Sequence, residues 1–197
     1  MSSQLAMSSR RQALGRTLSQ VASVGLLSAG IWAVTRKVTG PERSRTDGYS
    51  VQKSETDWQQ QLSPVQYQIL RQGGTEPPNY SILVNEKRPG TFACAGCGTK
   101  LFESAQKFNS GTGWPSFARG LEGVEVEDVD LVTANLVGAE LRCRTCGGHL
   151  GDVFRDGKLF VGTPAFETGQ RFCIDGAALV FEPENGEESV RGDIKAS

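Results

Sequence analysis

The chain has 197 residues, of which 38% are hydrophobic and 22% are charged, and its formal net charge is -1. This length allows one globular domain with a modest core, and this composition excludes a coiled coil and a disordered acidic chain. No nucleic acid is expected as a partner, because phosphate binding usually shows as a basic surplus. With 24 glycines, eight prolines and a single histidine, the chain is expected to be rich in turns and mainly β.

Residues 1–46 differ from the rest and are predicted to be a targeting or signal-anchor segment. Up to Pro41 there is no acidic residue, and an apolar run over residues 21–34 lies between two basic groups, as in targeting segments. Arg10 and Arg11 resemble a twin-arginine export signal, which predicts a periplasmic or thylakoid location. The run is short for a full span of ~20 residues, so a membrane anchor is only one option. The alternative is a transit peptide for a chloroplast or mitochondrion.

One folded domain is expected over residues 63–183, between a polar linker at residues 47–62 and a flexible tail at residues 184–197. Ser63 followed by Pro64 predicts the start of a short helix, with serine as the N-cap and proline at the first helical position. A double glycine then ends this helix.

From Gly90 onward, short apolar runs are separated by Gly and Asp, and no long amphipathic helix intervenes. This pattern predicts antiparallel sheets rather than βαβ units. The predicted strands cover Thr91–Ala93, Lys100–Phe102, Val124–Val126, Asn135–Arg142, Leu159–Val161, Arg171–Ile174 and Ala178–Phe181.

Four of the five cysteines form two Cys-x-x-Cys pairs, Cys94 with Cys97 and Cys143 with Cys146, and glycine follows each pair. This spacing lets both thiolates of a pair bind one tetrahedral zinc ion. Two disulfides or two redox-active pairs are the alternatives. We expect one Zn²⁺ per chain in a closed four-sulfur site, which is structural because no position is open for water. Since residues 98–142 separate the pairs, the metal would join two distant hairpins.

The fifth cysteine, Cys173, has no partner of this kind, so its thiol is available for chemistry. On a strand, Arg171 would lie on the same face and favour the thiolate, and Asp175 would offer a hydrogen-bond acceptor there. Free cysteine is also commonly a small buried hydrophobe. Spacing alone leaves both interpretations open, because the distance between a cysteine and a histidine cannot be read from a sequence.

Two further residues are candidates for a site around Cys173. His149, the lone histidine, follows the second cysteine pair. Trp114 lies in the stretch Gly-Thr-Gly-Trp-Pro, which predicts a rigid surface loop that presents an aromatic ring. Each has a structural alternative, because a histidine beside a zinc site is often a hydrogen-bond partner and a tryptophan before proline is often packing.

Four motifs occur within residues 63–183: Gly-Trp-Pro-Ser-Phe, the paired Cys-x-x-Cys, His-Leu-Gly-x-Val-Phe and Arg-Phe-Cys. Together they resemble the methionine-R-sulfoxide reductases, B type, and Thr75–Pro78 resembles that family's entry segment. The resemblance implies a mainly β fold of two antiparallel sheets, the β-tent, with zinc on the paired cysteines. It also implies reduction of the R epimer of methionine sulfoxide, mainly in oxidised proteins, as protein repair under oxidative stress.

By this resemblance, Cys173 is the nucleophile and is left as a sulfenic acid. Trp114 lines the pocket for the substrate methyl group, His149 hydrogen-bonds or protonates the sulfoxide oxygen, and Arg171 tunes the thiolate. The candidate catalytic residues are Cys173, His149, Arg171, Asp175 and Asp152; the candidate substrate-binding residues are Trp114, Phe117 and Phe172; the candidate metal ligands are Cys94, Cys97, Cys143 and Cys146.

Three positions depart from the family's pattern. Asp152 stands where many members have a second histidine, and Asp175 where they have asparagine. Aspartate donates a proton only if its pKa is raised, so His149 is expected to carry more of the acid role. Thr112 stands where many relatives have a cysteine that resolves the sulfenic acid as a disulfide. We therefore expect a one-cysteine form, acting as a monomer, that depends on external thioredoxin or on glutaredoxin with glutathione.

The alternative from another class is a non-catalytic, zinc-ribbon-like interaction module. Such a module would need basic and aromatic residues around the cysteine pairs, but acidic residues offset the basic ones there. A relative that reduces another oxidised substrate, or none, is a second alternative, against which the motif residues Cys173, Trp114 and His149 argue.

Overall fold

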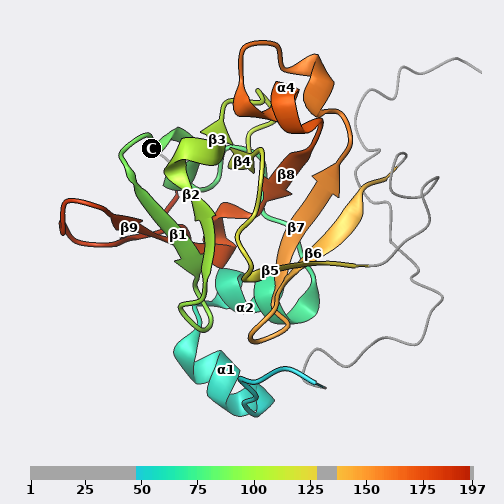
Figure 1. The fold of residues 1–197 in the computed structure, drawn as a ribbon. Helices are drawn as coiled ribbons and strands as arrows, with labels where there is room; N and C mark the ends of the chain where they lie inside the picture. Colours follow the sequence, from blue (N-terminus) through green and yellow to red (C-terminus); the bar gives the residue numbers. More distant parts are fainter. Residues whose placement is uncertain (1–47, 128–136, 196–197) are drawn as a thin grey trace, which may run out of the picture. The chain divides into compact units, whose positions relative to one another are not determined.

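The structure, a computed structural model, describes residues 48–127 and 137–195 (Figure 1). The predicted targeting segment at residues 1–46 lies outside the described residues, as does the start of the predicted strand Asn135–Arg142. Within the described ranges, no helix is long and apolar enough to cross a membrane.

Most of the regular structure is β. The strands are β1 (Gly90–Cys94), β2 (Lys100–Glu103), β3 (Lys107–Phe108), β4 (Ser116–Phe117), β5 (Val124–Val126), β6 (Ala139–Cys143), β7 (His149–Phe154), β8 (Arg171–Ile174), β9 (Leu179–Pro183) and β10 (Val190–Arg191). The α-helices are α1 (Glu55–Gln61), α2 (Pro64–Gln72) and α4 (Pro164–Thr168), and the 3-10 turns are η1 (Ile82–Asn85), η2 (Ser104–Gln106), η3 (Gly157–Leu159) and η4 (Gly176–Ala178).

The strands form two sheets, with the orders β10-β9-β1-β2 and β3-β4-β8-β7-β6-β5. Every pairing between these strands is antiparallel. The prediction of a mainly β fold with two antiparallel sheets is therefore confirmed, and Figure 1 shows α2 beside the sheets and α4 near the start of β8.

Strand β8, which carries Cys173, lies inside the six-stranded sheet. Its pairing with β4 sets Ser116 opposite Cys173, and its pairing with β7 sets Asp152 opposite Cys173. Gly151 is required at this contact, because its φ is 142° and a Cβ there would lie 2.1 Å from the Cys173 carbonyl oxygen. The glycine between His149 and Asp152 thus lets β7 approach β8 closely beside the thiol.

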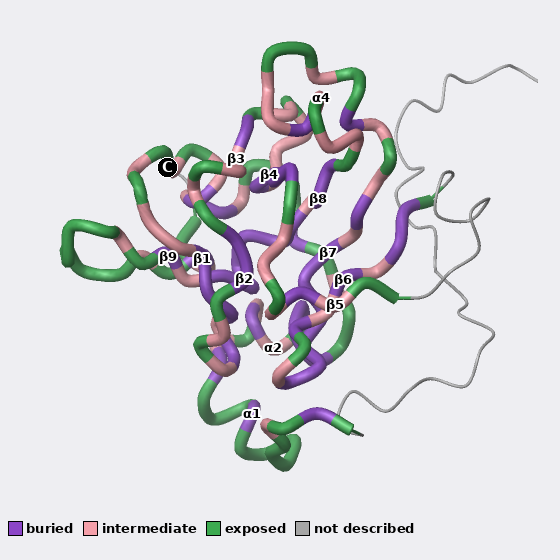
Figure 2. Tube along the Cα trace, in the orientation of Figure 1, coloured by how far each residue is buried: buried purple, intermediate pink, exposed green. Residues whose placement is uncertain are grey.

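A cluster of aromatic rings joins the two sheets. Phe92 and Phe102 of the four-stranded sheet meet Phe117 of the six-stranded sheet, with ring centroids 5.0 and 4.3 Å apart. Phe181 packs on Phe92 at 4.8 Å. All four rings are fully buried, and burying one phenylalanine side chain stabilises a fold by about 1.5–3 kcal/mol. Figure 2 shows buried residues along the paired strands and exposed residues over most of α1.

Helix α2 begins and ends as its sequence predicts. The Ser63 side chain accepts the Gln66 N–H, and the Gln66 side chain accepts the Ser63 N–H, so each satisfies a backbone donor of the first turn. Pro64 opens the helix, and Gly73 ends it in the left-handed region with φ of 67°. The helix packs on β7, which pairs with the Cys173 strand, and on η4, which follows that strand in the chain.

The structure differs from the expectation at both ends of the domain. Residues 47–62, expected to be a linker, contain the capped helix α1, and its Trp58 is buried in the core. Residues 184–197, expected to be a flexible tail, contain β10, in which Val190 pairs with β9. Both segments are too short to be stable alone, and they are stabilised by packing on the rest of the domain. A linear sequence does not reveal such contacts.

The predicted strand at Leu159–Val161 is wrong. This segment is the end of η3 and a turn, and Leu159 and Val161 are 77% and 79% exposed. Conversely, β3, β4 and β7 were not predicted. Two of them have only two residues, and β7 contains glycine, histidine and aspartate, which weaken a strand pattern.

Candidate active site and metal centre

The four paired cysteines converge where the turns of two hairpins meet. Cys94 and Cys97 belong to the β1–β2 hairpin, and Cys143 and Cys146 to the β6–β7 hairpin. The Cys94 and Cys146 sulfurs are 3.8 Å apart, and the Cys97 and Cys143 sulfurs are 3.5 Å apart. All four sulfurs lie within 4.8 Å of one another. The cluster therefore joins the four-stranded sheet to the six-stranded sheet.

This cluster fits a zinc ion. Tetrahedral zinc with Zn–S bonds of about 2.3 Å sets its sulfur ligands about 3.8 Å apart, close to the two spacings observed here. In the two turns, Gly98 and Gly147 have left-handed φ values of 74° and 69° and donate their N–H groups to the Cys94 and Cys143 carbonyls at 2.8 Å. The four thiols could thus hold a metal in a closed site that excludes a further ligand.

Cys173 lies outside this cluster, and its side chain is half-buried. Burial raises the pKa of its thiol above the ordinary value. The charge of Arg171 and a hydrogen bond from the Thr112 side chain favour the thiolate and so lower this pKa. The charges of Asp175 and Asp152 disfavour the thiolate and raise the pKa further. The resting form at neutral pH is therefore the thiol, and the thiolate forms only when the site provides a further stabilising charge or a base.

Arg171 lies on the same face of β8 as Cys173, as the spacing predicts. Its guanidinium donates to the Asp156 carboxylate, with Nε at 3.0 Å and Nη2 at 2.7 Å. It also stacks on the rings of Phe154 and Phe160, 4.4 and 5.9 Å from their centroids. Because Asp156 already neutralises part of this charge, Arg171 lowers the pKa of the Cys173 thiol by less than burial raises it.

His149 is buried between two carboxylates. Its Nδ1 lies 2.7 Å from Glu140 Oε1, and its Nε2 lies 3.6 Å from Asp175 Oδ2. Burial opposes the charged ring, but the interactions with Asp175 and Glu140 outweigh burial and raise the pKa of His149 to about 9. Burial likewise raises the pKa of Glu140, but His149 and Arg142 lower it further, to about 2. The ring is therefore an imidazolium at neutral pH and carries protons on both nitrogens.

Asp175 directly follows β8 at the N-cap position of η4 and is 3% exposed. Its carboxylate makes no capping hydrogen bond to η4. Instead, Oδ1 accepts the backbone N–H of Glu76 at 2.9 Å, and Oδ2 faces His149. The N–H groups of Gly176 and Ala177, at the start of η4, both donate to the Glu76 carboxylate at 2.8 Å.

Trp114 is half-buried in the loop between β3 and β4. Gly111 and Gly113 take left-handed φ values of 71° and 92° in this loop. The indole Nε1–H donates to the Glu76 carbonyl at 3.1 Å, and the Gly113 carbonyl accepts the Asn79 N–H at 2.7 Å. The loop is thus fastened to the segment that holds Asp175, in line with the expectation of a rigid loop.

Thr112, in the same loop, belongs to a row of three hydroxyl groups near Cys173. Its Oγ1 lies 2.8 Å from Ser110 Oγ, which in turn lies 2.7 Å from Ser116 Oγ. Ser116 is the residue opposite Cys173 in the β4–β8 pairing. Because the Thr112 side chain lowers the pKa of the Cys173 thiol, the residue that stands in place of a resolving cysteine touches the candidate nucleophile.

The structure places Phe117 and Phe172, the other candidate substrate-binding residues, in the core. Phe117 is fully buried and stacks on Phe102 in the core. Phe172 is also buried and packs edge-on against Phe102, with centroids 6.1 Å apart. The physical reason is the alternation of side chains along a strand, which points Phe172 to the face of β8 opposite to that of Cys173.

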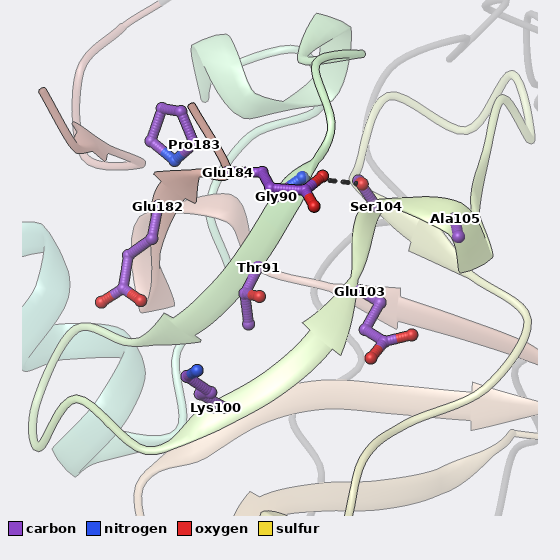
Figure 3. Close-up of a pocket in the computed structure, with 9 residues that line it drawn as sticks. All are labelled: Gly90, Thr91, Lys100, Glu103, Ser104, Ala105, Glu182, Pro183 and Glu184. Atoms are coloured by element: carbon purple, nitrogen blue, oxygen red, sulfur yellow. Dashed lines mark hydrogen bonds between the residues drawn. The ribbon is translucent and has the colours of Figure 1, made fainter. Parts of the chain in front are cut away.

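Two hollows of the described structure lie apart from this site. One, of about 480 Å³, lies on the four-stranded sheet, where Figure 3 shows Thr91, Lys100, Glu103 and Glu182 projecting from neighbouring strands. The other, of about 610 Å³, borders the turn at residues 94–98. Neither is lined by Cys173 or by the residues around it.

The fold and these contacts define a β domain in which a four-cysteine cluster joins two sheets and a fifth thiol lies beside an arginine, a threonine and two aspartates. The SelR domain family matches residues 62–183. A peptide methionine sulfoxide reductase MsrB of Leifsonia xyli subsp. xyli is 44% identical over 137 residues, 70% of this chain and 94% of that protein. The protein of the same name from Bradyrhizobium diazoefficiens is 43% identical over 142 residues, 72% of this chain and 97% of that protein.

The chain therefore belongs to the SelR family, the methionine-R-sulfoxide reductases of the B type, and is an oxidoreductase rather than a non-catalytic interaction module. Among solved structures, the C-terminal domain of Caenorhabditis elegans Dicer-related helicase 3 (DRH-3) has a TM-score of 0.40 and 15% identity, and the match covers 56% of this chain and 64% of that one. A likeness at this level supports no inference about this chain.

Sequence reasoning missed three carboxylates that shape the site. Glu76 holds η4, Glu140 bonds His149, and Asp156 bonds Arg171. The only sequence signal for Glu76 is its place in Thr-Glu-Pro-Pro, and nothing in a linear sequence pairs it with residues about 100 positions later.

Proposed function

We propose that the chain reduces the R epimer of methionine sulfoxide, mainly within oxidised proteins, to methionine, with Cys173 as the nucleophile. The observation that carries this proposal is the half-buried Cys173 thiol, flanked by Arg171 and Thr112. The imidazolium of His149 is held in the same region by Asp175, two residues beyond the thiol. A nucleophile and a proton donor are the two groups that sulfoxide reduction requires.

In the proposed reaction, the Cys173 thiolate attacks the sulfur atom of the sulfoxide and forms an S–S bond. The protonated oxygen then passes to the Cys173 sulfur, as the S–O bond of the substrate and the new S–S bond break and methionine leaves. The substrate sulfur gains two electrons, and the Cys173 sulfur loses two and keeps the oxygen as a sulfenic acid. A thiol and a sulfoxide thus give a sulfenic acid and methionine, and no other reactant is consumed. Protein repair under oxidative stress is the role that this chemistry supports.

The proposed proton donor to the sulfoxide oxygen is His149, because its pKa of about 9 keeps it protonated at neutral pH. The proton that leaves the Cys173 thiol restores the donor, so the overall reaction neither releases nor takes up a proton. We assign Asp175 to orienting the imidazolium, from which it lies 3.6 Å. Arg171 favours the thiolate, and Asp152 has the smaller role because its charge disfavours the thiolate.

We propose that the Trp114 ring packs against the methyl group of the substrate. This half-buried ring stands on a loop that the Glu76 carbonyl and Asn79 fasten. A fixed aromatic wall positions the substrate sulfur for attack and excludes water from it, and such positioning supplies a large part of many rate enhancements.

Regeneration is proposed to use an external thiol. The chain has five cysteines, and the four outside Cys173 are grouped in the metal cluster. With Thr112 beside Cys173, no internal thiol is available to resolve the sulfenic acid. Two thiol equivalents would convert it to thiol and water and leave as a disulfide, with thioredoxin, or glutaredoxin with glutathione, as the proposed donor.

The four paired cysteines are proposed to hold one structural Zn²⁺. When bound, the ion supplies a crosslink between the β1–β2 and β6–β7 hairpins, and structural zinc contributes on the order of 10 kcal/mol in small peptides. Because four thiolates complete a tetrahedron, we assign the ion no step in the reaction.

The experiment that tests this function is an NADPH-coupled assay on the separated R and S sulfoxides, free and within a peptide, with thioredoxin and glutaredoxin tried in parallel. Turnover of the R epimer alone, lost in Cys173→Ser, is expected. Turnover of the S epimer, or of neither epimer with either reductant, would contradict the proposal.

We also propose that residues 1–46 direct the chain to a compartment or anchor it to a membrane. The support is the sequence pattern alone, with Arg10 and Arg11 before the apolar run. A fluorescent protein fused after residue 46 should leave the cytosol, and Arg10→Lys with Arg11→Lys should retain it if the twin-arginine pathway is used. Export that is unaffected by the double substitution favours a transit peptide or another route.

A further inference from the structure

The start of η4 is capped from a distant part of the chain. Aspartate at an N-cap position ordinarily turns its carboxylate onto the free backbone N–H groups that follow it. Here Asp175 occupies that position and makes no such bond. The Gly176 and Ala177 N–H groups instead donate to the two carboxylate oxygens of Glu76, each at 2.8 Å.

This arrangement releases the Asp175 carboxylate for other contacts. The N–H groups that Asp175 would otherwise cap donate to Glu76. Asp175 Oδ2 instead lies 3.6 Å from His149 Nε2, and Asp175 Oδ1 accepts the backbone N–H of Glu76. Both carboxylates are 3% exposed, so water does not compete for these contacts. If Glu76 lost its carboxylate, two buried N–H groups beside Asp175 would lack partners, and a turn of the Asp175 side chain would satisfy them at the expense of His149.

The same residue also fixes the aromatic wall. The Trp114 indole N–H donates to the Glu76 carbonyl at 3.1 Å, and the Asn79 N–H donates to the Gly113 carbonyl at 2.7 Å. A Cβ at Gly113 would lie 2.7 Å from the Cβ of Pro78, so the Trp114 loop rests directly on this segment. Glu76 therefore links the two parts of the site: its backbone carbonyl holds the Trp114 loop, and its carboxylate holds the start of η4 after β8.

We propose that Glu76 is a positioning residue: by capping η4 in place of Asp175, it leaves the Asp175 carboxylate facing His149 and holds Trp114 at the same site. The effect of this role on turnover rests on the proposed function, but the contacts of Glu76 do not depend on it. Glu76 itself contacts no reacting atom in this scheme and acts through Asp175 and Trp114.

The test is the titration of His149 by NMR in the zinc-loaded, untagged chain. His149 is the single histidine of the sequence, so its ring signals need no assignment. Its midpoint is expected to fall in Asp175→Asn, which removes one of its two carboxylate charges. Glu76→Ala is also expected to lower the midpoint. The double variant is expected to show little further shift, because both changes remove the same contact, the one between Asp175 and His149.

The matched control is Ser81→Ala. Ser81 is fully buried, packs against Gly176 and accepts the Leu83 N–H at 3.2 Å, and within the described residues its hydroxyl forms no hydrogen bond with Asp175 or Trp114. It should destabilise the same corner of the fold without moving the His149 midpoint. An unchanged midpoint in Glu76→Ala, or an equal shift in Ser81→Ala, would overturn the proposal.

If Glu76→Ala does not fold, Glu76→Gln decides the question. Glutamine keeps only one of the two acceptor oxygens, and its NH2 group cannot accept the N–H that the other oxygen bound. A smaller shift in the same direction is therefore expected, and no shift would count against the role. Activity provides a separate readout: Glu76→Gln should raise KM more than Ser81→Ala does at equal stability. The NMR result stands even if the chain reduces no sulfoxide, so failure of the proposed function and failure of this inference are distinguishable.

Discussion

His149 Nδ1 lies 2.7 Å from Glu140 Oε1, and folding moves the pKa values of these two residues apart. The pKa of His149 rises from 6.5 to about 9, and that of Glu140 falls from 4.5 to about 2. Each shift means that folding favours the charged form of that residue, so the pair also contributes to stability. The structure, rather than the solvent, therefore keeps the proposed acid protonated.

The first prediction is a loss of stability at alkaline pH. Because the folded pKa of His149 exceeds its unfolded value, its contribution is fully present below pH 6.5 and is lost as pH rises through about 9. The loss should be about 3 kcal/mol at most. Urea unfolding of the wild type and of His149→Gln at about pH 6 and about pH 10 measures it.

The comparison between the two proteins is necessary, because Glu76 and Lys107 also titrate in this range. Burial raises the pKa of Glu76 to about 7 and lowers that of Lys107 to about 8. Their effects are common to both proteins and cancel in the difference. Equal pH dependence in the wild type and in His149→Gln would show that the ring is not held as an imidazolium.

The second prediction ranks the two polar residues of β7. General acids typically accelerate a reaction by about 10²–10⁴-fold, so His149→Ala should lower kcat/KM for the R sulfoxide by about 100-fold or more. Asp152→Asn should lower it much less, because the charge of Asp152 raises the pKa of the Cys173 thiol. Steady-state kinetics on purified, zinc-loaded variants provides the test, and equal losses in the two variants would contradict the ranking.

The same Asp152→Asn variant has a second expected effect. Removing this charge should lower the pKa of the Cys173 thiol and shift the pH profile of its alkylation by iodoacetamide to lower pH. The control is Cys173→Ser, which reports any background reaction of the metal-cluster cysteines. A shift to higher pH would mean that Asp152 acts on the thiol by some means other than its charge.

The parts of the fold that could be predicted from the sequence are those that depend on residues close together in the chain. The cap at Ser63 and the glycine end of α2 depend on neighbours in the chain, and the Cys-x-x-Cys turns carry their own spacing. The site depends on contacts between distant residues. Glu76 reaches Ala177, and Arg171 reaches Asp156 rather than only the Cys173 thiol, and no periodicity signals either contact.

The third prediction concerns the metal cluster. Cys97→Ser should reduce bound zinc well below one per chain and abolish cooperative unfolding, because a contribution on the order of 10 kcal/mol rivals the whole stability of a typical domain. Zinc content by a chelating dye and circular dichroism melting measure the two effects. The matched control is Cys173→Ser, which lies outside the cluster and should keep both the zinc and the melting transition. Loss of zinc in Cys173→Ser would contradict the division between structural and reactive cysteines.

The fourth prediction follows from the contact between Thr112 and Cys173. After one turnover without reductant, the wild type should gain the mass of one oxygen on Cys173, because the residue that its thiol meets is a hydroxyl. Thr112→Cys should instead lose two hydrogens by forming a disulfide between residues 112 and 173, since a thiol beside a sulfenic acid condenses with it. Intact mass with peptide mapping distinguishes the two products.

The fourth prediction has a matched control in the same loop. In Ser110→Cys the new thiol replaces a hydroxyl that contacts those of Thr112 and Ser116, whereas the hydrogen bond to the Cys173 thiol comes from Thr112. Ser110→Cys should therefore form the disulfide more slowly than Thr112→Cys. A disulfide between Cys173 and a metal-cluster cysteine in the wild type would contradict the one-cysteine scheme. With Thr112→Cys, turnover should become independent of glutathione and continue with thioredoxin, because an internal disulfide replaces the exposed sulfenic acid as the species to be reduced.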